Sequence, residues 1–162
     1  MEGLILASRG KSSTGRGAAG AGLDLAKVDY ERLAEFRYVL RRFLIFSENA
    51  AKAAGLTAQH HQALLAIKGF PGRDRITTGE LAERLGIRHH SAVGLVDRLA
   101  SNALVRRRHG LADRRQVFLE LTPQAAQVLA RLSAAHRDEL GRLAPVLKGL
   151  LAPYDRPRSK PA

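Results

Sequence analysis

Apolar residues recur every three or four positions from about residue 24 to residue 54, which is the period of one face of an α-helix. Leu33, Phe36 and Leu40 belong to this stripe, and Gly55 follows at a position that suits the end of a helix. Helices in globular proteins average about 11–12 residues, so a helix over this whole stretch is longer than a compact domain needs. We therefore expect part of this helix to pack against another subunit.

Three shorter helical patterns follow along the chain. The first begins after Thr57, a residue type that caps helix N-termini. The second begins at Thr77 and Glu80, whose Thr-x-x-Glu spacing forms a capping box, and it ends at Gly86. The third covers about residues 89–101. The residues expected to face the core are Leu64, Leu65 and Ile67 in the first helix, Leu81, Ala82 and Leu85 in the second, and Ala92, Leu95, Val96 and Leu99 in the third.

The hydrophobic period changes to two after these helices, which indicates β-structure. Residues 116–121 form a predicted half-buried strand, with which residues 104–107 can pair. The loop over residues 109–115 is longer than a tight hairpin turn. The expected core-facing residues of the strand are Val117, Leu119 and Leu121, and the outward-facing ones are Gln116, Phe118 and Glu120.

Helical patterns return after the strands. Thr122 is a candidate N-cap, and Pro123 suits the first position of a helix. This helix runs past His136, and a further helical stretch continues to about residue 151. Pro145 lies inside that stretch, where a proline kinks or divides a helix.

Composition and charge narrow the class of protein. Apolar residues make up 45% of the 162 residues, but aromatic residues make up only 5%, so Ala and Leu supply most of the packing and favour helices. The net charge of +12 suits a polyanionic partner, either nucleic acid or an anionic membrane surface. Part of the basic excess lies near the chain ends. Because no exposed amphipathic helix carries its basic residues along one face, we expect no membrane partner.

The chain has no cysteine, which excludes disulfides, thiolate catalysis and cysteine metal sites, and agrees with a cytoplasmic location. No two histidines have the i, i+4 spacing that places two imidazoles on one metal ion, so a metal site would have to be assembled between elements. Ser91 and His90 are neighbours on a helix surface, not an assembled dyad, and no paired carboxylates appear. We predict a protein that is not an enzyme and has no metal and no cofactor.

Three segments together resemble the MarR-type winged helix-turn-helix transcriptional regulators. They are GELAERLGI at residues 79–87, LVDRLASNALVRR at 95–107 and ADRRQVFLELTPQA at 112–125. A helix-turn-helix alone is a weak signal, but the combination of these segments in this order is specific. The resemblance implies a mainly α fold with a small β-hairpin wing. It implies a MarR-type domain over residues 24–152, with a DNA-binding lobe at 57–122 and dimerisation helices at 24–54 and 123–152. The composition of the chain ends, rich in Gly, Ser, Ala and Arg at the start and in proline and basic residues at the finish, predicts a flexible leader (1–23) and a disordered basic tail (153–162).

The chain departs from the family pattern at several positions. The family usually has Ser-Pro or similar at residues 88–89, and a larger basic or polar residue at Gly94. It favours glycine where Ala103 and Ala125 stand. Ala103 is unexpected because helix ends often need a left-handed backbone, which alanine adopts poorly, so Asn102 is a candidate for that conformation.

A helix fits the major groove of DNA, and its outward side chains reach base edges there. Gly94 is either a means of closer approach to the groove or a tolerated residue. The family resemblance places Arg114 and Arg115 in a wing along the minor groove, and it gives Asp113 and Arg115 a structural role, in which they pair and hold the wing in shape. The basic strand residues either contact phosphate or form a solvated edge. The candidate DNA-binding residues are Arg88, His89, His90, Ser91, Gly94, Arg98, Arg106, Arg108, Arg114 and Arg115.

The resemblance also implies a homodimer that binds a palindromic operator on double-stranded DNA, with half-sites about 34–36 Å apart. Family members often bind small anionic aromatic molecules between the dimerisation helices and the DNA-binding lobe. The candidate pocket residues are Phe36, Arg37, Leu40, Phe43, Phe46, His60, His61 and Leu64, for which ordinary core or dimer packing is the alternative. We expect a sequence-specific repressor controlled by a small effector. The alternative is an architectural DNA-binding protein with little sequence preference.

Overall fold

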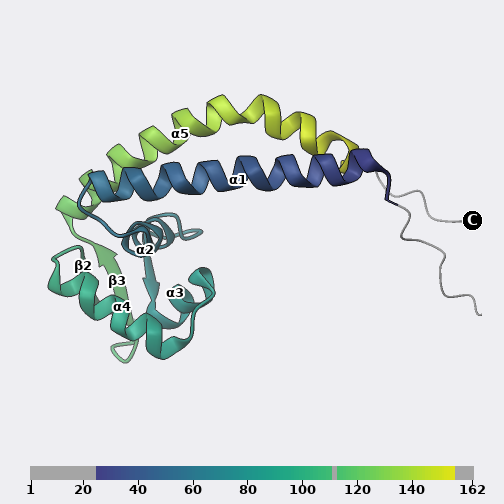
Figure 1. Cartoon of the computed structure of the whole chain (residues 1–162). Helices are drawn as coiled ribbons and strands as arrows, with labels where there is room; N and C mark the ends of the chain where they lie inside the picture. Colours follow the sequence, from purple (N-terminus) through teal and green to yellow (C-terminus); the bar gives the residue numbers. More distant parts are fainter. Residues whose placement is uncertain (1–24, 111–112, 156–162) are drawn as a thin grey trace, which may run out of the picture.

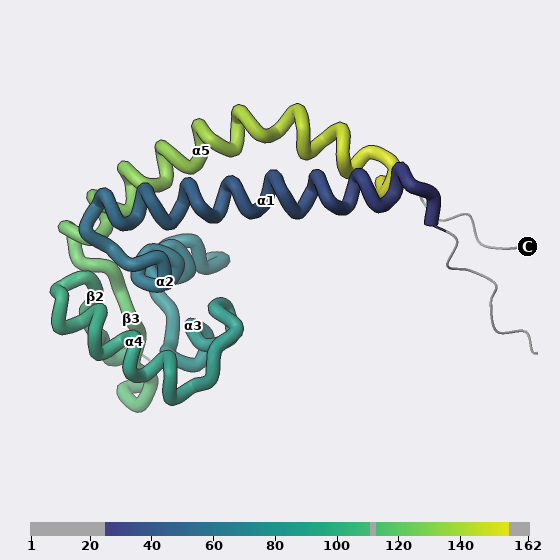
Figure 2. Tube along the Cα trace, in the orientation of Figure 1, coloured from purple at the N-terminus to yellow at the C-terminus, as the bar shows by residue number. Residues whose placement is uncertain are grey.

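Two long helices lie side by side and carry a smaller lobe at one end (Figures 1 and 2). The computed structural model describes residues 25–110 and 113–155. The long helices are α1 (Lys27–Ala53) and α5 (Pro123–Leu151). The predicted long first helix is therefore confirmed, and the next residues, Ala54 and Gly55, complete its C-terminus with Gly55 at φ +76°.

The short 3₁₀ helix η1 (Ala152–Tyr154) follows α5. Regular structure therefore continues past residue 152, where the predicted domain ended. The predicted leader over residues 1–23 and the rest of the predicted tail, residues 156–162, lie outside the described residues.

The lobe contains a helix-turn-helix and a three-stranded sheet. Its elements are α2 (Ala58–Lys68), β1 (Arg75–Thr77), α3 (Thr78–Leu85), α4 (His89–Ser101), β2 (Val105–His109) and β3 (Val117–Leu121). The strands are antiparallel in the order β1-β3-β2. The fold class predicted from the sequence is confirmed, but the sheet has one strand more than predicted. The hydrophobic pattern did not indicate β1 because three residues are too few to show an alternation, and pairing with β3 defines this strand.

The local signals that start and stop the helices behave as predicted. The Thr57 hydroxyl accepts a hydrogen bond from the His60 backbone N–H at 3.0 Å. At α3 the Thr77 hydroxyl accepts from the Glu80 N–H, and the Glu80 carboxylate accepts from the Thr77 N–H at 2.8 Å, which completes the capping box. Gly86 then ends α3 in the left-handed region at φ +63°.

The core of the lobe lies between the sheet and helices α2 to α5. Leu65 was predicted to be part of it, but this side chain is 48% exposed. Leu64 and Ile67 occupy the buried face of α2, and Leu65 is rotated by about 100° from Leu64 at 3.6 residues per turn. The largest fully buried side chains are Leu64, Ile67, Ile76, Leu81, Leu95, Leu99, Leu119 and Val96.

Phe118 corrects a second prediction. It projects from the outer face of β3, as its position in the alternation requires, yet it is only 7% exposed. The guanidinium carbons of Arg73 and Arg75 lie 5.4 and 4.6 Å from the centre of its ring. Long basic side chains therefore cover an aromatic ring on the face that the sequence pattern assigned to solvent.

The predicted division of the last helix at Pro145 is wrong. α5 is a single helix from Pro123 to Leu151, and it arches over α1 (Figure 1). Pro145 and Gly141 are both exposed, so water can hydrate the carbonyl group that the missing proline N–H leaves free. No helix within the described ranges is both long and apolar enough to cross a bilayer.

Ala103 itself adopts the left-handed conformation, at φ +53°, whereas Asn102 has φ −87°. The suggestion that Asn102 would take this role is therefore wrong. The backbone N–H of Leu104 donates to the Leu99 carbonyl at 2.9 Å and closes the end of α4, which fixes the left-handed residue at position 103.

Ala103→Gly is expected to raise the free energy of unfolding by about 1 kcal/mol, because glycine adopts a positive φ without the clash of a Cβ atom. Ala125→Gly is the matched control, since the family favours glycine at both positions. Ala125 is buried inside the first turn of α5, where glycine should cost about 1 kcal/mol. Urea unfolding of both variants measures these changes, and equal destabilisation by both would contradict the assignment of strain to Ala103.

Candidate nucleic-acid interface

The exposed face of α4 is the first part of the candidate interface. Ala92, Leu95, Val96 and Leu99 anchor this helix in the core, as predicted. The exposed residues at its start are Arg88, His89, His90 and Ser91. The structure thus presents four of the predicted DNA-binding residues together at the start of α4, whose opposite face packs in the apolar core.

Val93 belongs to the same surface and was missed from the sequence. It is 40% exposed and lies three and four residues after His90 and His89. The helical period indicates its position, but an apolar side chain by itself gives no sign of a contact with DNA. An apolar side chain on such a helix suits contact with the methyl group of thymine.

Arg98 is exposed in the last turn of α4. A Cβ atom at Gly94 would be 3.6 Å from Arg98 Nη1, which is ordinary van der Waals contact. Burial and then the charge of Arg98 lower the pKa of His60 in α2. No contact within the described chain requires glycine at position 94.

The basic residues of β2 alternate between two faces of the wing. Arg106 and Arg108 lie on the outer face, where their Nε atoms are 3.2 and 3.9 Å from a carboxylate oxygen of Glu120. Arg107 projects from the opposite face and forms an ion pair with Asp97 of α4. The structure therefore does not bring Arg106 and Arg108 to the side of the wing that contacts α4.

The tip of the wing presents Arg114 and Arg115, whose side chains are exposed. The Asp113 carboxylate accepts a hydrogen bond from the Arg115 backbone N–H at 2.9 Å. The family resemblance implied that Asp113 and Arg115 pair, and this contact joins them through the Arg115 main chain; the described residues include no ion pair between the two side chains. Asp113 thus shapes the turn through the main chain and leaves the Arg115 guanidinium free of it.

Gly110 is required for this turn. Its N–H donates to the Gln116 carbonyl at 2.8 Å, and a Cβ atom would lie only 2.7 Å from the Asp113 carbonyl oxygen. The same Cβ atom would be 3.3 Å from the Phe118 ring. The two strands can close below Arg114 and Arg115 only because residue 110 has no side chain.

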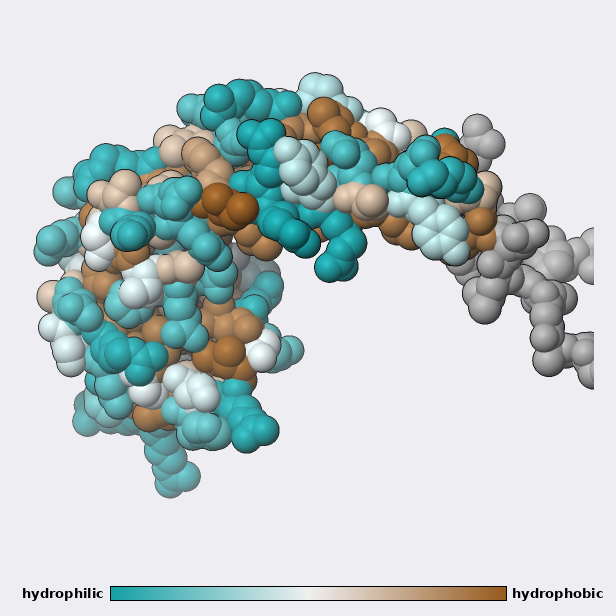
Figure 3. All heavy atoms as spheres, viewed as in Figure 1, coloured by the Kyte–Doolittle hydropathy of each residue, from teal (hydrophilic) through white to brown (hydrophobic). Residues whose placement is uncertain are grey.

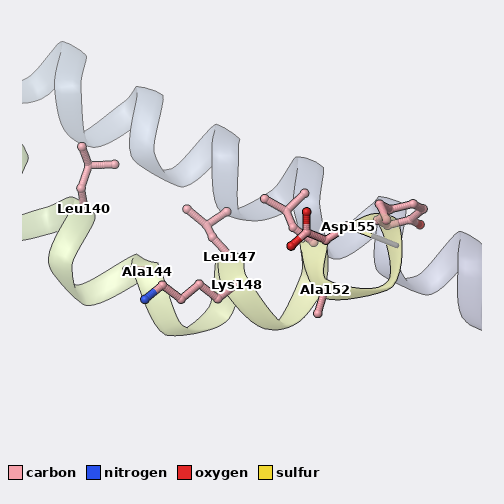
Figure 4. A pocket seen from close by; sticks show the side chains of 8 residues that line it. Leu140, Ala144, Leu147, Lys148, Ala152 and Asp155 are labelled. Carbon is pink, nitrogen blue, oxygen red and sulfur yellow. The ribbon is translucent and has the colours of Figure 1, made fainter. Parts of the chain in front are cut away.

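The predicted pocket residues do not line a single pocket. Arg37 and Leu40 line a hollow of about 250 Å³ on α1, and His60 lines another of about 480 Å³. Leu64 is part of the core, and Phe36 is half-buried on α1. Another hollow, of about 740 Å³, runs along the C-terminal half of α5, where Leu140 and Leu147 point toward α1 (Figure 4). It contains none of the predicted residues.

Phe43, Phe46 and His61 instead converge on His136 of α5. The His61 and His136 ring centres are 4.7 Å apart, and those of Phe43 and Phe46 lie 5.8 and 5.4 Å from His136. Burial and then the neighbouring His136 lower the pKa of His61. This junction cluster joins both long helices to α2, and it was missed because it depends on contacts far apart in sequence.

His136 is held by hydrogen bonds as well as by stacking. Its Nδ1 is 2.6 Å from the Leu132 carbonyl oxygen, and its Nε2 is 2.8 Å from the Ser47 hydroxyl. In neutral His136 the Nδ1–H therefore donates to the carbonyl, and Nε2 accepts from Ser47. Across residues 25–110 and 113–155, no three His, Asp or Glu side chains gather as a metal site would require.

An exposed helix seated on an apolar core, beside a two-stranded wing with arginines at its tip, defines a winged helix-turn-helix protein. The model of the MarR family matches residues 54–116. This lobe belongs to the MarR family, and the resemblance inferred from the sequence is confirmed.

Solved structures agree on the fold. AbsC, a MarR family transcriptional regulator from Streptomyces coelicolor, is 21% identical over 80% of this chain and 93% of its own, with a TM-score of 0.62. A MarR family protein from Bacillus stearothermophilus is 19% identical over 74% of this chain and 82% of its own, with a TM-score of 0.62. A point mutant of MepR from S. aureus, bound to an oligodeoxyribonucleotide, is 16% identical over 72% and 82%, with a TM-score of 0.57. No curated protein matches the sequence.

Proposed function

We propose that this protein is a homodimeric, sequence-specific transcriptional regulator that binds double-stranded DNA and acts as a repressor. The observation that supports this function best is the exposed start of α4 next to a wing tipped by Arg114 and Arg115. The MepR mutant, which has a similar fold, was solved with a bound oligodeoxyribonucleotide.

In this proposal α4 enters the major groove. His89, His90 and Ser91 carry hydrogen-bonding groups toward base edges, and Val93 offers an apolar contact. Arg88 lies at the N-terminus of the helix, where both its charge and the helix dipole favour a phosphate. Gly94 has no side chain, so in this proposal the helix backbone approaches the groove closely there, and no contact within the described chain requires a glycine at this position.

The wing supplies affinity through charge. Arg114 and Arg115 follow the minor groove or its phosphates. Arg106 and Arg108 contribute less, because they share the carboxylate of Glu120 on the other face of the wing. The exposed ion pair between Arg107 and Asp97 joins the wing to α4.

Dimerisation is proposed from the apolar residues that the single chain leaves exposed on its long helices. Hydrophobic patches lie along the two long helices in Figure 3. The exposed apolar residues include Leu33, Leu40, Leu44, Ile45, Leu140, Val146 and Leu151. A second copy covering these side chains would remove the apolar surface from water, and it would set two α4 helices at the spacing of two half-sites.

We also propose control by a small aromatic or anionic effector. Phe43, Phe46 and His61 meet His136 where the long helices join the lobe. A ligand that separated these rings would change the spacing of the two α4 helices and so the affinity for DNA.

Selection of bound fragments from genomic DNA, followed by footprinting, tests the proposed function. A sequence-specific dimer should protect a palindromic site and prefer it about a thousandfold or more over random duplex. Equal binding to unrelated duplexes would instead identify an architectural protein. Absence of binding to any duplex at low ionic strength would refute the proposal.

Replacing Arg114 and Arg115 by alanine together is expected to weaken binding to all duplexes and to lower the salt slope by about one for each phosphate that is no longer neutralised. Fluorescence anisotropy over a series of salt concentrations measures this slope. Arg131→Ala with Arg137→Ala removes the same charge from exposed positions on α5 and should preserve it. An unchanged slope in the wing variant would exclude a role for the wing in binding.

A further inference from the structure

We propose that Arg73 is a positioning residue that fixes the wing relative to the helix-turn-helix. Arg73 precedes β1, outside the segments that carry the family resemblance. Its guanidinium touches the loop before β1, the N-terminus of α3 and the root of the wing. The effect on DNA affinity rests on the proposed function, whereas the effect on the wing does not.

Hydrogen bonds tie Arg73 to the start of α3. Its Nη2 forms an ion pair with Glu80, and its Nε–H donates to the Arg75 carbonyl at 3.0 Å. The other oxygen of Glu80 accepts from the backbone and hydroxyl of Thr77. Burial opposes ionisation of Glu80, but these hydrogen bonds from Thr77 and Arg73 outweigh it and lower the pKa of this carboxyl.

Aromatic contacts tie the same guanidinium to the wing. Its central carbon lies 4.6 Å from the ring centre of Phe70 and 5.4 Å from that of Phe118. Phe118 is a residue of β3, and its ring packs beside Gly110, where the wing loop closes. Arg73 therefore contacts Glu80 at the start of α3 and Phe118 at the base of the wing at once.

Lysine cannot replace arginine in this role. A guanidinium is planar, contacts aromatic rings with its face, and offers Nε–H and Nη–H donors in fixed directions. An ammonium keeps the charge and can pair with Glu80, but it cannot make all of these contacts together. Arg73→Lys therefore separates a positioning role from a simple electrostatic one.

Amide hydrogen exchange in the full-length protein tests the positioning role directly. Arg73→Gln and Arg73→Lys should each speed exchange at the wing amides, including Gly110, about tenfold, equivalent to about 1.4 kcal/mol. Exchange at Leu129 and Leu132 in α5 should change by less than about twofold. Arg84→Gln is the matched control, because the Arg84 guanidinium lies 5.1 Å from the ring centre of Phe70 and belongs to α3 rather than to the loop before β1.

DNA binding provides the second readout. Both Arg73 variants should lower the affinity about tenfold and reduce the salt slope by about one, because a mobile wing neutralises fewer phosphates. Wing exchange that stays as in the parent protein, equal acceleration throughout the chain, or full rescue by Arg73→Lys would each overturn the proposal. If the parent protein binds no duplex, the proposed function fails, and the exchange data still decide the role of Arg73.

Discussion

Leu44→Glu is expected to convert the protein into a monomer and to lower its affinity for the selected DNA site by at least about a hundredfold, since one half-site alone binds far more weakly than two. Leu44 is 54% exposed on α1 and lies four residues after Leu40, on the same face. A carboxylate there would be buried without a partner if a second subunit covered this face, and such burial costs several kcal/mol.

Leu65→Glu provides the matched control for this prediction. Leu65 is a leucine of similar exposure, 48%, but it lies on α2 in the lobe rather than on the long helices. Light scattering and anisotropy should show that this variant remains a dimer with unchanged affinity. If Leu44→Glu also stays dimeric, the face around Leu40 and Leu44 is not the dimer interface.

The helices of this fold could be predicted because their signals are local. Thr57, the pair Thr77 and Glu80, and Thr122 all cap helices as their sequence positions indicated. The buried face of α4 followed from the helical period alone, and with it the residues that this helix leaves exposed. Such features depend on neighbours within one or two turns.

The features that escaped prediction depend on contacts between distant segments. β1 exists because it pairs with β3, and Phe118 is buried because Arg73, which precedes β1, and Arg75 of β1 cover its ring. The junction at His136 joins α1, α2 and α5. Helical or strand periodicity carries no information on contacts between distant segments. The sequence therefore did not indicate that Arg73 and His136 join separate elements of the fold.

Ala103 shows a different limit. The sequence indicated that a left-handed residue was needed at the end of α4, and local preference favoured asparagine over alanine. The hydrogen bond from Leu104 to Leu99 and the Thr122 hydroxyl bonded to the Ala103 carbonyl at 2.8 Å fix the turn at Ala103 instead. One hydrogen bond within the turn and one from Thr122 thus override a local preference worth about 1 kcal/mol.

Acidification is expected to destabilise the folded protein through His61. Burial and then His136 lower the pKa of His61 in the folded chain, whereas the pKa of this side chain in the unfolded chain is about 6.5. Above that pH both states are neutral at His61, and this residue contributes no pH dependence. Below it the unfolded chain takes up a proton that the folded chain resists, so the free energy of unfolding falls until the pH reaches the folded pKa. His60, whose pKa is lowered by burial and Arg98, acts in the same direction.

Urea unfolding at about pH 7.5 and about pH 5.5, on either side of the unfolded pKa and at one protein concentration, measures this loss. His61→Gln removes the titrating group but keeps a polar side chain, and it should reduce the difference in stability between the two pH values. His90→Gln removes an exposed imidazole from α4 and should leave that difference as it is in the parent protein. An equal loss of stability in the parent protein and in His61→Gln would show that His61 does not couple protons to folding. A smaller loss of stability in His61→Gln than in the parent protein would place the acid-sensitive contact at the junction between α2 and α5. His61 stacks on His136 there, and a positive charge on either ring destabilises this contact.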